Sequence, residues 1–467
     1  MSNIIIVRAM RNRFRCLFMV AIISMFMACS ANDPGNTTPT PTPGPEPAPT
    51  PTPTEINSYT IMTYGCGGGE LDEYYEACIK VVAQLDPPSH INIVGQMKWS
   101  NGYKSKWSNG EGGVTRFSYN HALKTFDNKH FSDNSFKMDD PANLAEFIEW
   151  ARDVAPADEY IIVFMGHGNA YHPSFEGDAT RAIMRDDESP EYLGLSGIVD
   201  AFEAADAHFG LTFMMSCLMN SIEYVTELEP YTNYYLASSH VTSISGGEIY
   251  SIVESLMGMS EYDEHSIAEA VTYYIDQDYD MWWCQNPLAI DHTLTKCSNM
   301  AELNGAIREF TDIVVGLYDE QAKIGADAMD SRYGFTVATI DKALSEAYYP
   351  VNASISESQI EMVQWYRLDY AFDIVDIASK VANATKHGEL VSAAEKIKSA
   401  ATKTITYQRD ANLEAVDRVY YTAVLINREQ WESLGMELAG YEDTAFDKAT
   451  GWSRLLKING ATFMHCR

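Results

Sequence analysis

Two apolar stretches near the middle of the chain have the pattern of buried parallel strands. Residues 160–165 lead into Gly-His-Gly, and residues 211–215 lead into Ser-Cys. Between them, residues 195–209 carry apolar side chains at the spacing of one helix face. A strand–helix–strand crossover brings both strand ends to the same edge of a parallel sheet. We therefore expect His167 and Cys217 to be neighbours in space.

Further segments extend this pattern into an α/β protein with a mostly parallel central sheet. The other expected strands are 59–64, 91–97, 114–119, 234–238, 287–291 and 420–426. The other expected helices are 71–85, one beginning at Pro141, 218–228, 248–257, 265–274, 300–318 and 360–382. The glycine-rich loop 65–69 lacks the Lys-Ser/Thr ending of a phosphate-binding loop, so a nucleotide is not an expected ligand.

Residues 1–28 have the pattern of an export signal. Four arginines between positions 8 and 15 precede an apolar run, 16–28, that is too short to span a bilayer comfortably. The run ends in Ala28-Cys29, which resembles the cleavage site of bacterial lipoproteins, although Phe26 stands where leucine is usual. We expect Cys29 to be lipidated and to become the new N-terminus. Cleavage by an ordinary signal peptidase nearby is the alternative.

Residues 29–57 are expected to form a tether. Proline occupies every second position from Pro39 to Pro53, a composition that cannot build a core and favours polyproline II. At about 3.1 Å per residue, this tract could hold a domain roughly 45 Å from its anchor. Residues 58–260 are then expected to form the core. Residues 261–467 are expected to pack on it and complete the sheet.

Composition and charge narrow the choice of partners. Of the 467 residues, 46% are hydrophobic and 12% are aromatic, which is ample for a large core. The formal net charge of −32 becomes about −36 when the four arginines of the signal are removed. Such a charge disfavours nucleic acid and anionic membrane surfaces as partners. A solvated acidic surface is the simplest interpretation.

The eight cysteines are spread along the chain without the spacing of a zinc site, so no structural metal is expected. Cys66 and Cys78 could pair in an oxidising compartment, as could Cys284 and Cys297. The spacing alone leaves both disulfide states open.

Three stretches together resemble the clostripain family of cysteine peptidases, within the clan of caspases, gingipains and legumains. They are YTIMTYGCGGGELDEYYE, DEYIIVFMGHGN and FMMSCLMNSIEYVTELEPYTNYYLASSH. Glu223, six residues after the cysteine, and Trp452 near the end add to a resemblance that covers roughly residues 58–460. It implies a caspase-like three-layer α/β/α sandwich with a helical and β-stranded C-terminal addition.

The resemblance implies that Cys217 is the nucleophile and His167 the general base and acid, without an essential third residue. It also implies that the N–H groups of Gly168 and Cys217 form the oxyanion hole, where each donor contributes roughly 3–4 kcal/mol. The residue chemistry agrees, because an imidazole stabilises a thiolate and protonates a leaving amine. A helix that begins directly after Cys217 would lower the pKa of its thiol further.

The expected substrate pocket departs from the family in one respect. The family usually has Asp two residues before the nucleophile, where it pairs with a substrate Arg or Lys, and this chain has Met215. A methionine cannot offset a buried guanidinium charge, so the basic specificity of the family is not carried over. Ser238 and Ser239 match the family's pocket wall. Their hydroxyls would suit a neutral or apolar residue at P1, the position before the cleaved bond.

The segment that follows the histidine strand holds further candidates for the base, the cleft wall and self-cleavage. The alternative base is His172, and the residues expected to shape the cleft are Asn169 and Tyr171. Family members can cleave themselves in this segment, where the exposed candidates are Arg181 and Arg185. With a methionine in the pocket, cleavage there is expected to be slow or absent.

Some relatives use calcium as a cofactor, and the same segment is acidic. A calcium site could be formed by Asp178, Asp186, Asp187 and Glu188. No EF-hand loop is present, so an exposed acidic loop is the simpler interpretation and no cofactor is expected.

The sequence leaves two classes of function. One is a cysteine endopeptidase that cleaves peptides or proteins while anchored by lipid in the cell envelope, in the periplasm or at the outer-membrane surface. The other is a catalytically silent relative that binds peptide or protein at the same cleft. Retention of His167, Gly168 and Cys217 favours the peptidase.

Overall fold

The structure is a computed structural model, and it divides the chain into two compact units, 1–54 and 55–467. All described residues belong to the second unit. They are 57–68, 71–108, 110–168, 170–171, 183–185, 192–240, 246–277, 292–348, 371–409, 419–425 and 438–458.

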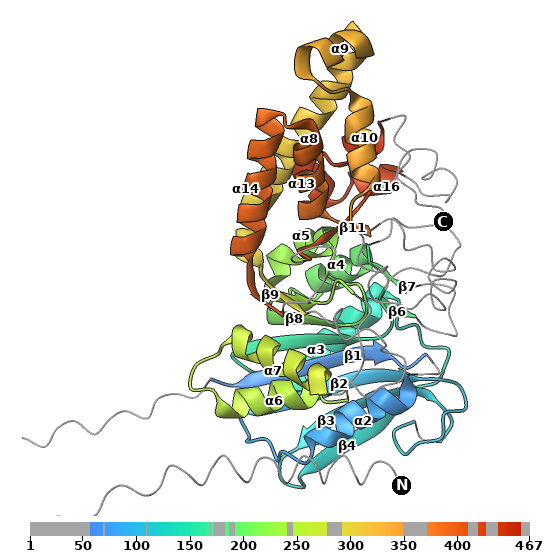
Figure 1. Cartoon of the computed structure of the whole chain (residues 1–467). Helices are drawn as coiled ribbons and strands as arrows, with labels where there is room; N and C mark the ends of the chain where they lie inside the picture. The colour runs from blue at the N-terminus through green and yellow to red at the C-terminus, as the bar shows by residue number, and fades with distance from the viewer. Residues whose placement is uncertain are drawn as a thin grey trace, which may run out of the picture. The chain divides into compact units, whose positions relative to one another are not determined.

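The described residues form one nine-stranded sheet in the order β12-β10-β9-β8-β5-β1-β2-β3-β4 (Figure 1). The strands are β1 (Tyr59–Cys66), β2 (Ile91–Trp99), β3 (Gly113–Asn120), β4 (Thr125–Ser132), β5 (Glu159–Met165), β8 (Phe209–Met215), β9 (Thr232–Ala237), β10 (Thr293–Lys296) and β12 (Ile405–Gln408). Strands β9, β8, β5, β1 and β2 pair in parallel, and antiparallel strands extend the sheet on both sides. The expected mostly parallel sheet is confirmed.

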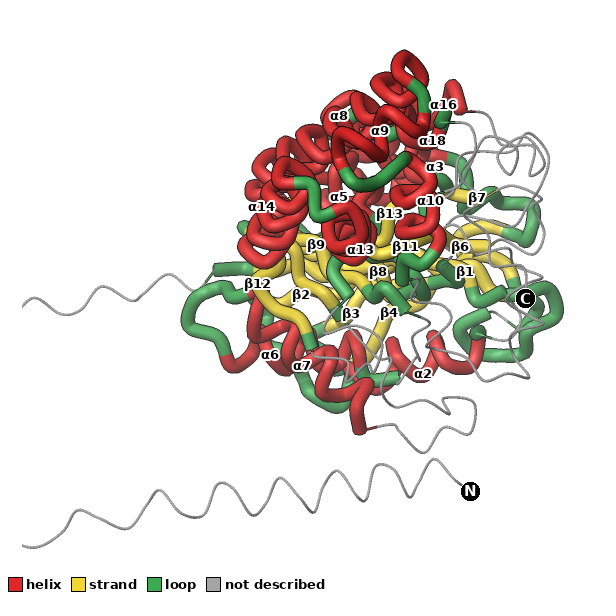
Figure 2. Tube along the Cα trace, turned by 45° about the horizontal axis from the view of Figure 1, so that its top comes forward, coloured by secondary structure: helices red, strands yellow, loops and turns green. Residues whose placement is uncertain are grey.

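Helices cover both faces of this sheet. One face carries α2 (Asp72–Val82), α6 (Glu248–Gly258) and α7 (Glu264–Gln277) (Figure 2). The other face carries α3 (Pro141–Val154), α4 (Leu195–Ala204), α5 (Ile222–Leu228), α8 (Met300–Ile324), α13 (Ile374–Thr385) and α14 (Gly388–Thr404). Each face has its own hydrophobic core, so the three-layer α/β/α sandwich is confirmed.

The remaining described elements are short. The helices are α9 (Ala326–Tyr333), α10 (Val337–Ser345), α16 (Leu438–Glu442), α17 (Ala445–Thr450) and α18 (Ser453–Leu456). Strands β6 (Ile183–Arg185) and β7 (Tyr192–Leu193) form one antiparallel pair, and β11 (Ala371–Asp373) and β13 (Thr422–Val424) form another.

Local sequence explains why α3 begins where it does, just before the histidine strand. The Asp140 side chain accepts a hydrogen bond from the Ala142 N–H at 2.9 Å, and Pro141 occupies the first turn, where no N–H is needed. Leu144 and Phe147 then lie on the buried face of the helix. The helix thereby packs on β1, the strand that pairs with β5.

The helix expected over residues 360–382 is wrong at its described beginning. Residues 371–373 are strand β11, which pairs with β13, and α13 starts only at Ile374. The Asp373 carboxylate caps α13 by accepting from the Asp376 N–H at 2.8 Å. The same carboxylate accepts the Tyr420 N–H at 2.6 Å, and burial raises its pKa to about 7.

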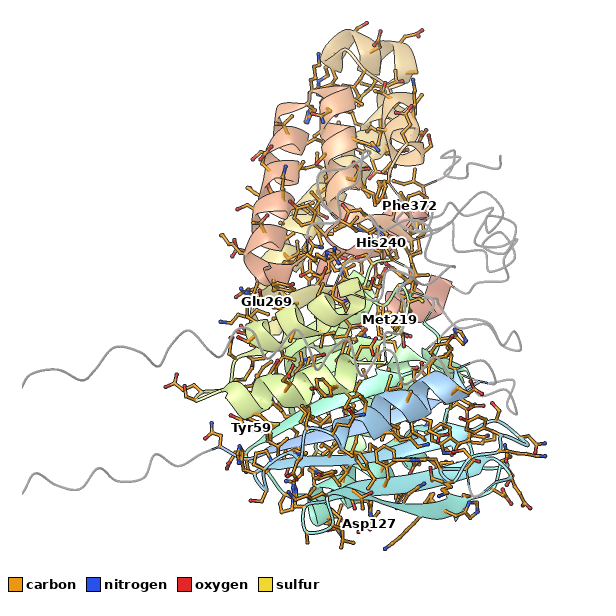
Figure 3. The ribbon with its side chains drawn as sticks, turned by 60° about the horizontal axis from the view of Figure 1, so that its bottom comes forward. Tyr59, Asp127, Met219, His240, Glu269 and Phe372 are labelled. Atoms are coloured by element: carbon orange, nitrogen blue, oxygen red, sulfur yellow. The ribbon has the colours of Figure 1, made fainter. Side chains whose placement is uncertain are left out.

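The antiparallel edge strands escape an apolar pattern search. In β4, most side chains are exposed or only partly buried, so the strand has no apolar run (Figure 3 shows Asp127 on it, far from Tyr59 at the start of β1). β10 is only four residues long, and the strand expected over 287–291 lies outside the described residues. The positions of β4 and β10 depend on the strands with which they pair rather than on an apolar pattern of their own.

Two further observations concern the cysteines and the membrane. Cys66 and Cys78 are both buried thiols, as is Cys297, whereas Cys284 lies outside the described residues. No helix in the described part of the chain has the length and hydropathy needed to cross a membrane.

Candidate active site

The pairing of β5 with β8 brings the histidine and cysteine loops to one edge of the sheet. Met165 lies opposite Met215 at the last paired position of these parallel strands. Immediately beyond, the Ser216 hydroxyl donates to the Gly166 carbonyl at 2.8 Å. The segments that follow β5 and β8 therefore leave the sheet side by side, as the crossover argument predicts.

Gly168 makes the closest approach between the two loops. A Cβ atom placed on Gly168 would lie 2.3 Å from the Cys217 carbonyl oxygen and 2.8 Å from the Ser216 Cβ. Real Cβ atoms do not approach backbone so closely, so only glycine fits at this position. His167 and Cys217 are both partly buried beside this contact. The structure thus places His167, Gly168 and Cys217 together.

The helix expected over residues 218–228 is confirmed from Ile222 onward, but its expected start directly after Cys217 is wrong. Helix α5 begins at Ile222, and the intervening residues form a loop in which Leu218 has a left-handed backbone with φ 64°. A helix N-terminus acts only within about one turn, so α5 cannot supply the lowered thiol pKa.

Backbone hydrogen bonds fix the loop that follows the cysteine. The Leu218 N–H donates to the His240 carbonyl at 2.9 Å, and the Asn220 N–H donates to the Ser238 carbonyl at 2.9 Å. The loop is thereby tied to the chain that leaves β9. A left-handed residue other than glycine is uncommon and is held by such surrounding contacts.

Asn220 also joins this loop to the C-terminal part of the chain. Its side-chain amide donates to the Tyr420 carbonyl at 2.6 Å and to the Ser239 hydroxyl at 2.8 Å. The backbone carbonyl of Asn220 accepts the Thr422 N–H at 3.1 Å. Tyr420 and the strand β13 that follows it therefore support the cysteine loop from about 200 residues away in sequence.

Glu223 makes a second connection to the C-terminal part. Its carboxyl group is fully buried, which raises its pKa, and it accepts the Val424 N–H and the Tyr441 hydroxyl, both at 2.9 Å. The Ser221 hydroxyl is a third donor. Three donors satisfy a group that would otherwise be costly to bury.

The histidine loop is held by the same region. Tyr171 is buried, and its ring makes edge contacts with Tyr224 at 6.2 Å and with Tyr441 at 5.7 Å between centroids. Tyr171 therefore anchors its loop. Trp452 completes the support, because its indole N–H donates to the Val424 carbonyl at 2.6 Å.

The three residues expected to form the substrate pocket lie around the end of β8. Met215 is buried in the hydrophobic core that α2 and α6 cover. Ser238 and Ser239 are fully buried, and each hydroxyl has a hydrogen bond inside the protein, to the His240 carbonyl and the Asn220 amide respectively. No acidic residue replaces the family's Asp on this stretch of β8.

Several expected site residues lie outside the described residues. They are Asn169, His172, Asp178, Arg181, Asp186, Asp187 and Glu188. Within the segment that contains them, the structure describes the backbone of β6, which includes Arg185. This strand lies against β1 and β5. The described residues contain no cluster of three or more His, Cys, Asp or Glu that could hold a metal ion.

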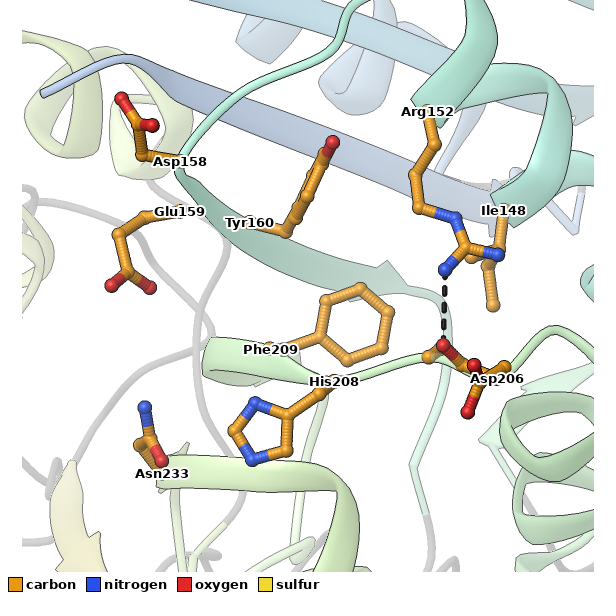
Figure 4. A pocket seen from close by; sticks show the side chains of 10 residues that line it. Ile148, Arg152, Asp158, Glu159, Tyr160, Asp206, His208, Phe209 and Asn233 are labelled. Atoms are coloured by element: carbon orange, nitrogen blue, oxygen red, sulfur yellow. Dashed lines mark hydrogen bonds between the residues drawn. The ribbon is translucent and has the colours of Figure 1, made fainter.

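A separate hollow of about 380 Å³ lies at the opposite edge of the sheet (Figure 4). It is lined by residues at the amino ends of β5, β8 and β9, among them Glu159, His208 and Asn233. Arg152 on its wall donates to the Asp206 carbonyl at 3.0 Å. Because the cysteine lies at the carboxyl ends of these strands, this hollow is no part of the same site.

A histidine and a cysteine whose loops meet at one edge of a sheet are a pair that can supply a thiolate nucleophile. A family model described as the clostripain family matches residues 118–457. Since this match covers most of the chain, the protein belongs to the clostripain family of cysteine peptidases. Among curated proteins, no significant match is found.

Solved structures share this fold. A secreted C11 cysteine protease from Bacteroides thetaiotaomicron, iotapain, is 14% identical with a TM-score of 0.54. The same kind of protease in complex with an irreversible peptide inhibitor is 12% identical with a TM-score of 0.55. An inactive zymogen C11 protease from Parabacteroides distasonis is 13% identical with a TM-score of 0.56. Each likeness covers 85% of this chain and 99% of the other.

We expect Gly168→Ala to slow covalent labelling of Cys217 by about 100-fold or more, because the added methyl group would push the two loops apart. The measurement is the labelling rate with a peptidyl acyloxymethyl ketone that has a neutral P1 residue. Gly316→Ala is the matched control, since nothing lies within 4 Å of a Cβ at this α8 position. Normal labelling of Gly168→Ala would contradict the inferred geometry.

Proposed function

We propose that this protein is an exported cysteine endopeptidase in which Cys217 is the nucleophile and His167 the general base and acid. The observation that carries the proposal is the close approach of Gly168 to the Cys217 backbone. His167, which precedes Gly168, is then within reach of the Cys217 thiol. Two loops held this tightly supply the fixed geometry that covalent catalysis needs.

In the proposed reaction, His167 accepts the thiol proton and the Cys217 thiolate adds to the carbonyl carbon of the substrate. The N–H groups of Gly168 and Cys217 stabilise the negative charge that develops on the carbonyl oxygen. His167 then returns the proton to the leaving amine as the peptide bond breaks, which leaves an acyl-enzyme. Water, deprotonated by His167, hydrolyses the thioester and restores the thiol.

Cys217→Ala and His167→Ala should each abolish peptide hydrolysis while the melting temperature changes little, because both residues are partly exposed at strand ends. His208→Ala, an exposed histidine at the opposite edge of the sheet, should hydrolyse peptides normally and serves as the control. Near-normal turnover by His167→Ala would point to another base, and His172 would be tested next.

The same assay separates the peptidase from a catalytically silent binding relative. A parent protein that folds but neither hydrolyses peptides nor reacts with an acyloxymethyl ketone at Cys217 would support the silent relative. Labelling at Cys217 requires an activated thiolate and would exclude it.

We also propose that the P1 pocket disfavours Arg and Lys. Met215 carries no charge, and it packs among apolar side chains of the core on this face. A cationic P1 side chain would lose its water without gaining a counter-charge from this residue. Neutral side chains such as Met, Leu, Gln or Ala are therefore the expected P1 residues.

Met215→Asp should raise kcat/KM for Arg and Lys peptides by about 30- to 1,000-fold, equivalent to 2–4 kcal/mol of transition-state binding. Cleavage of the protein itself after Arg181 or Arg185 should be slow in the parent and should appear in this variant. A P1-scanning fluorogenic library measures the preference, and Met215→Leu is the uncharged control. A parent that already strongly prefers Arg or Lys would refute the assignment.

We further propose that the mature protein starts at a lipid-modified Cys29 and is held in the cell envelope by the proline-rich tether of residues 29–57. The basic start, the short apolar run and Ala28-Cys29 support this anchor. Metabolic labelling with an alkynyl fatty acid should mark the parent, and Cys29→Ala should carry no label. Persistent label on Cys29→Ala would place the modification elsewhere.

A further inference from the structure

One buried polar group near the proposed nucleophile has no role in the mechanism above. The Tyr75 side chain on α2 is fully buried, and its hydroxyl has no hydrogen-bond partner among the residues that the structure describes. Buried hydroxyls in folded proteins nearly always have a partner, because an unpaired one is costly. An unsatisfied donor beside a binding site points to a ligand that satisfies it.

Tyr75 lies on the side of the sheet where the P1 side chain is expected. It belongs to the same hydrophobic core as Met165 and Met215, the residues that end β5 and β8. Burial raises the pKa of its phenol well above the usual value, and electrostatic interaction with the Cys217 sulfur and with Glu248 raises it further. The phenol therefore belongs to the core on which the end of the cysteine strand packs.

A buried carboxyl group lies on the same side. Glu248 is in the first turn of α6 and is 1% exposed. It accepts a hydrogen bond from the Cys78 thiol at 3.7 Å, and Cys78 lies one turn after Tyr75 on α2. Helices α2 and α6 cover this face of the sheet together (Figure 2). The region thus offers a hydroxyl donor, a carboxyl acceptor and the thioether of Met215.

We propose that Tyr75 is a specificity-determining residue of the P1 pocket and that the preferred P1 side chain is a carboxamide, as in Gln or Asn. This inference rests on the proposed peptidase function. The carboxamide oxygen would accept the Tyr75 hydroxyl, and its NH2 group would donate to Glu248. The methylene groups of Gln would pack on the Met215 thioether.

The other classes of side chain fit less well. Lys and Arg are donors only and cannot accept the Tyr75 hydroxyl proton. Asp and Glu could accept it, but Glu248 would repel their charge. Leu and Met would leave the hydroxyl without a partner, and pockets built around a hydrogen bond discriminate strongly against analogues that lack it.

The test compares Gln with Met at P1, because the two side chains have similar length and only Gln carries the amide. The parent should cleave the Gln peptide at least about tenfold faster, as kcat/KM, than the Met peptide. Tyr75→Phe removes one oxygen atom and should lower the Gln-to-Met ratio by about 10- to 100-fold. Tyr119→Phe, the same change in a buried tyrosine on β3, should leave the ratio as in the parent.

Glu248→Gln is a second variant that removes the charge and keeps the shape. It should reduce discrimination against Glu at P1, a readout that a purely structural role for Glu248 would not change. A parent that cleaves Met, Leu or Lys peptides better than Gln peptides would overturn the proposal. So would a Tyr75→Phe protein with an unchanged Gln-to-Met ratio.

Failure of the underlying function has a different signature. A parent that cleaves no peptide and is not labelled at Cys217 would refute both the peptidase and the P1 preference. A parent that is active with another preference refutes only the role of Tyr75.

Discussion

The parallel pairing of β5 with β8, in which Met165 lies opposite Met215, determines where the loops that carry His167 and Cys217 leave the sheet. Two strands that end at the same level release their loops side by side. The Ser216 hydroxyl bond to Gly166 and the contact of Gly168 with Cys217 keep these loops together. A shift of one residue in this register would move the loops apart and reverse the faces of Met214 and Met215.

The loops need support because neither one is part of a helix or strand. Their support comes from the C-terminal part of the chain through Asn220, Glu223 and Tyr171. Each buried hydrogen bond contributes only about 1 kcal/mol net, but leaving any of these groups unpaired would cost more. Together they define one arrangement of the loops, and that single arrangement is what a covalent reaction requires.

The sequence predicts the core of this fold because the central strands are buried on both faces. Their apolar runs, and the helix spacing of α4, are visible without any knowledge of partners. The juxtaposition of His167 with Cys217 follows from the same crossover rule. The polar strand β4, the short β10 and the start of α13 at Asp373 depend on tertiary pairing, so periodicity does not predict them. The start of the helix expected directly after Cys217 is wrong for a similar reason. The apolar residues of the loop continue the helical spacing of α5, but the left-handed backbone of Leu218 keeps the loop from being helical.

The contacts of Asn220 also constrain when the protein can become functional. Tyr420 and Thr422 are among the last described residues of the chain, and they join the cysteine loop across about 200 residues. Contacts of such long range form late in folding, because a large loop must close before they can be made. Synthesis proceeds from the N-terminus, so His167 and Cys217 both emerge long before the strand that supports them. The order of residues along the chain thereby delays assembly of the site until Tyr420 and Thr422 have been made.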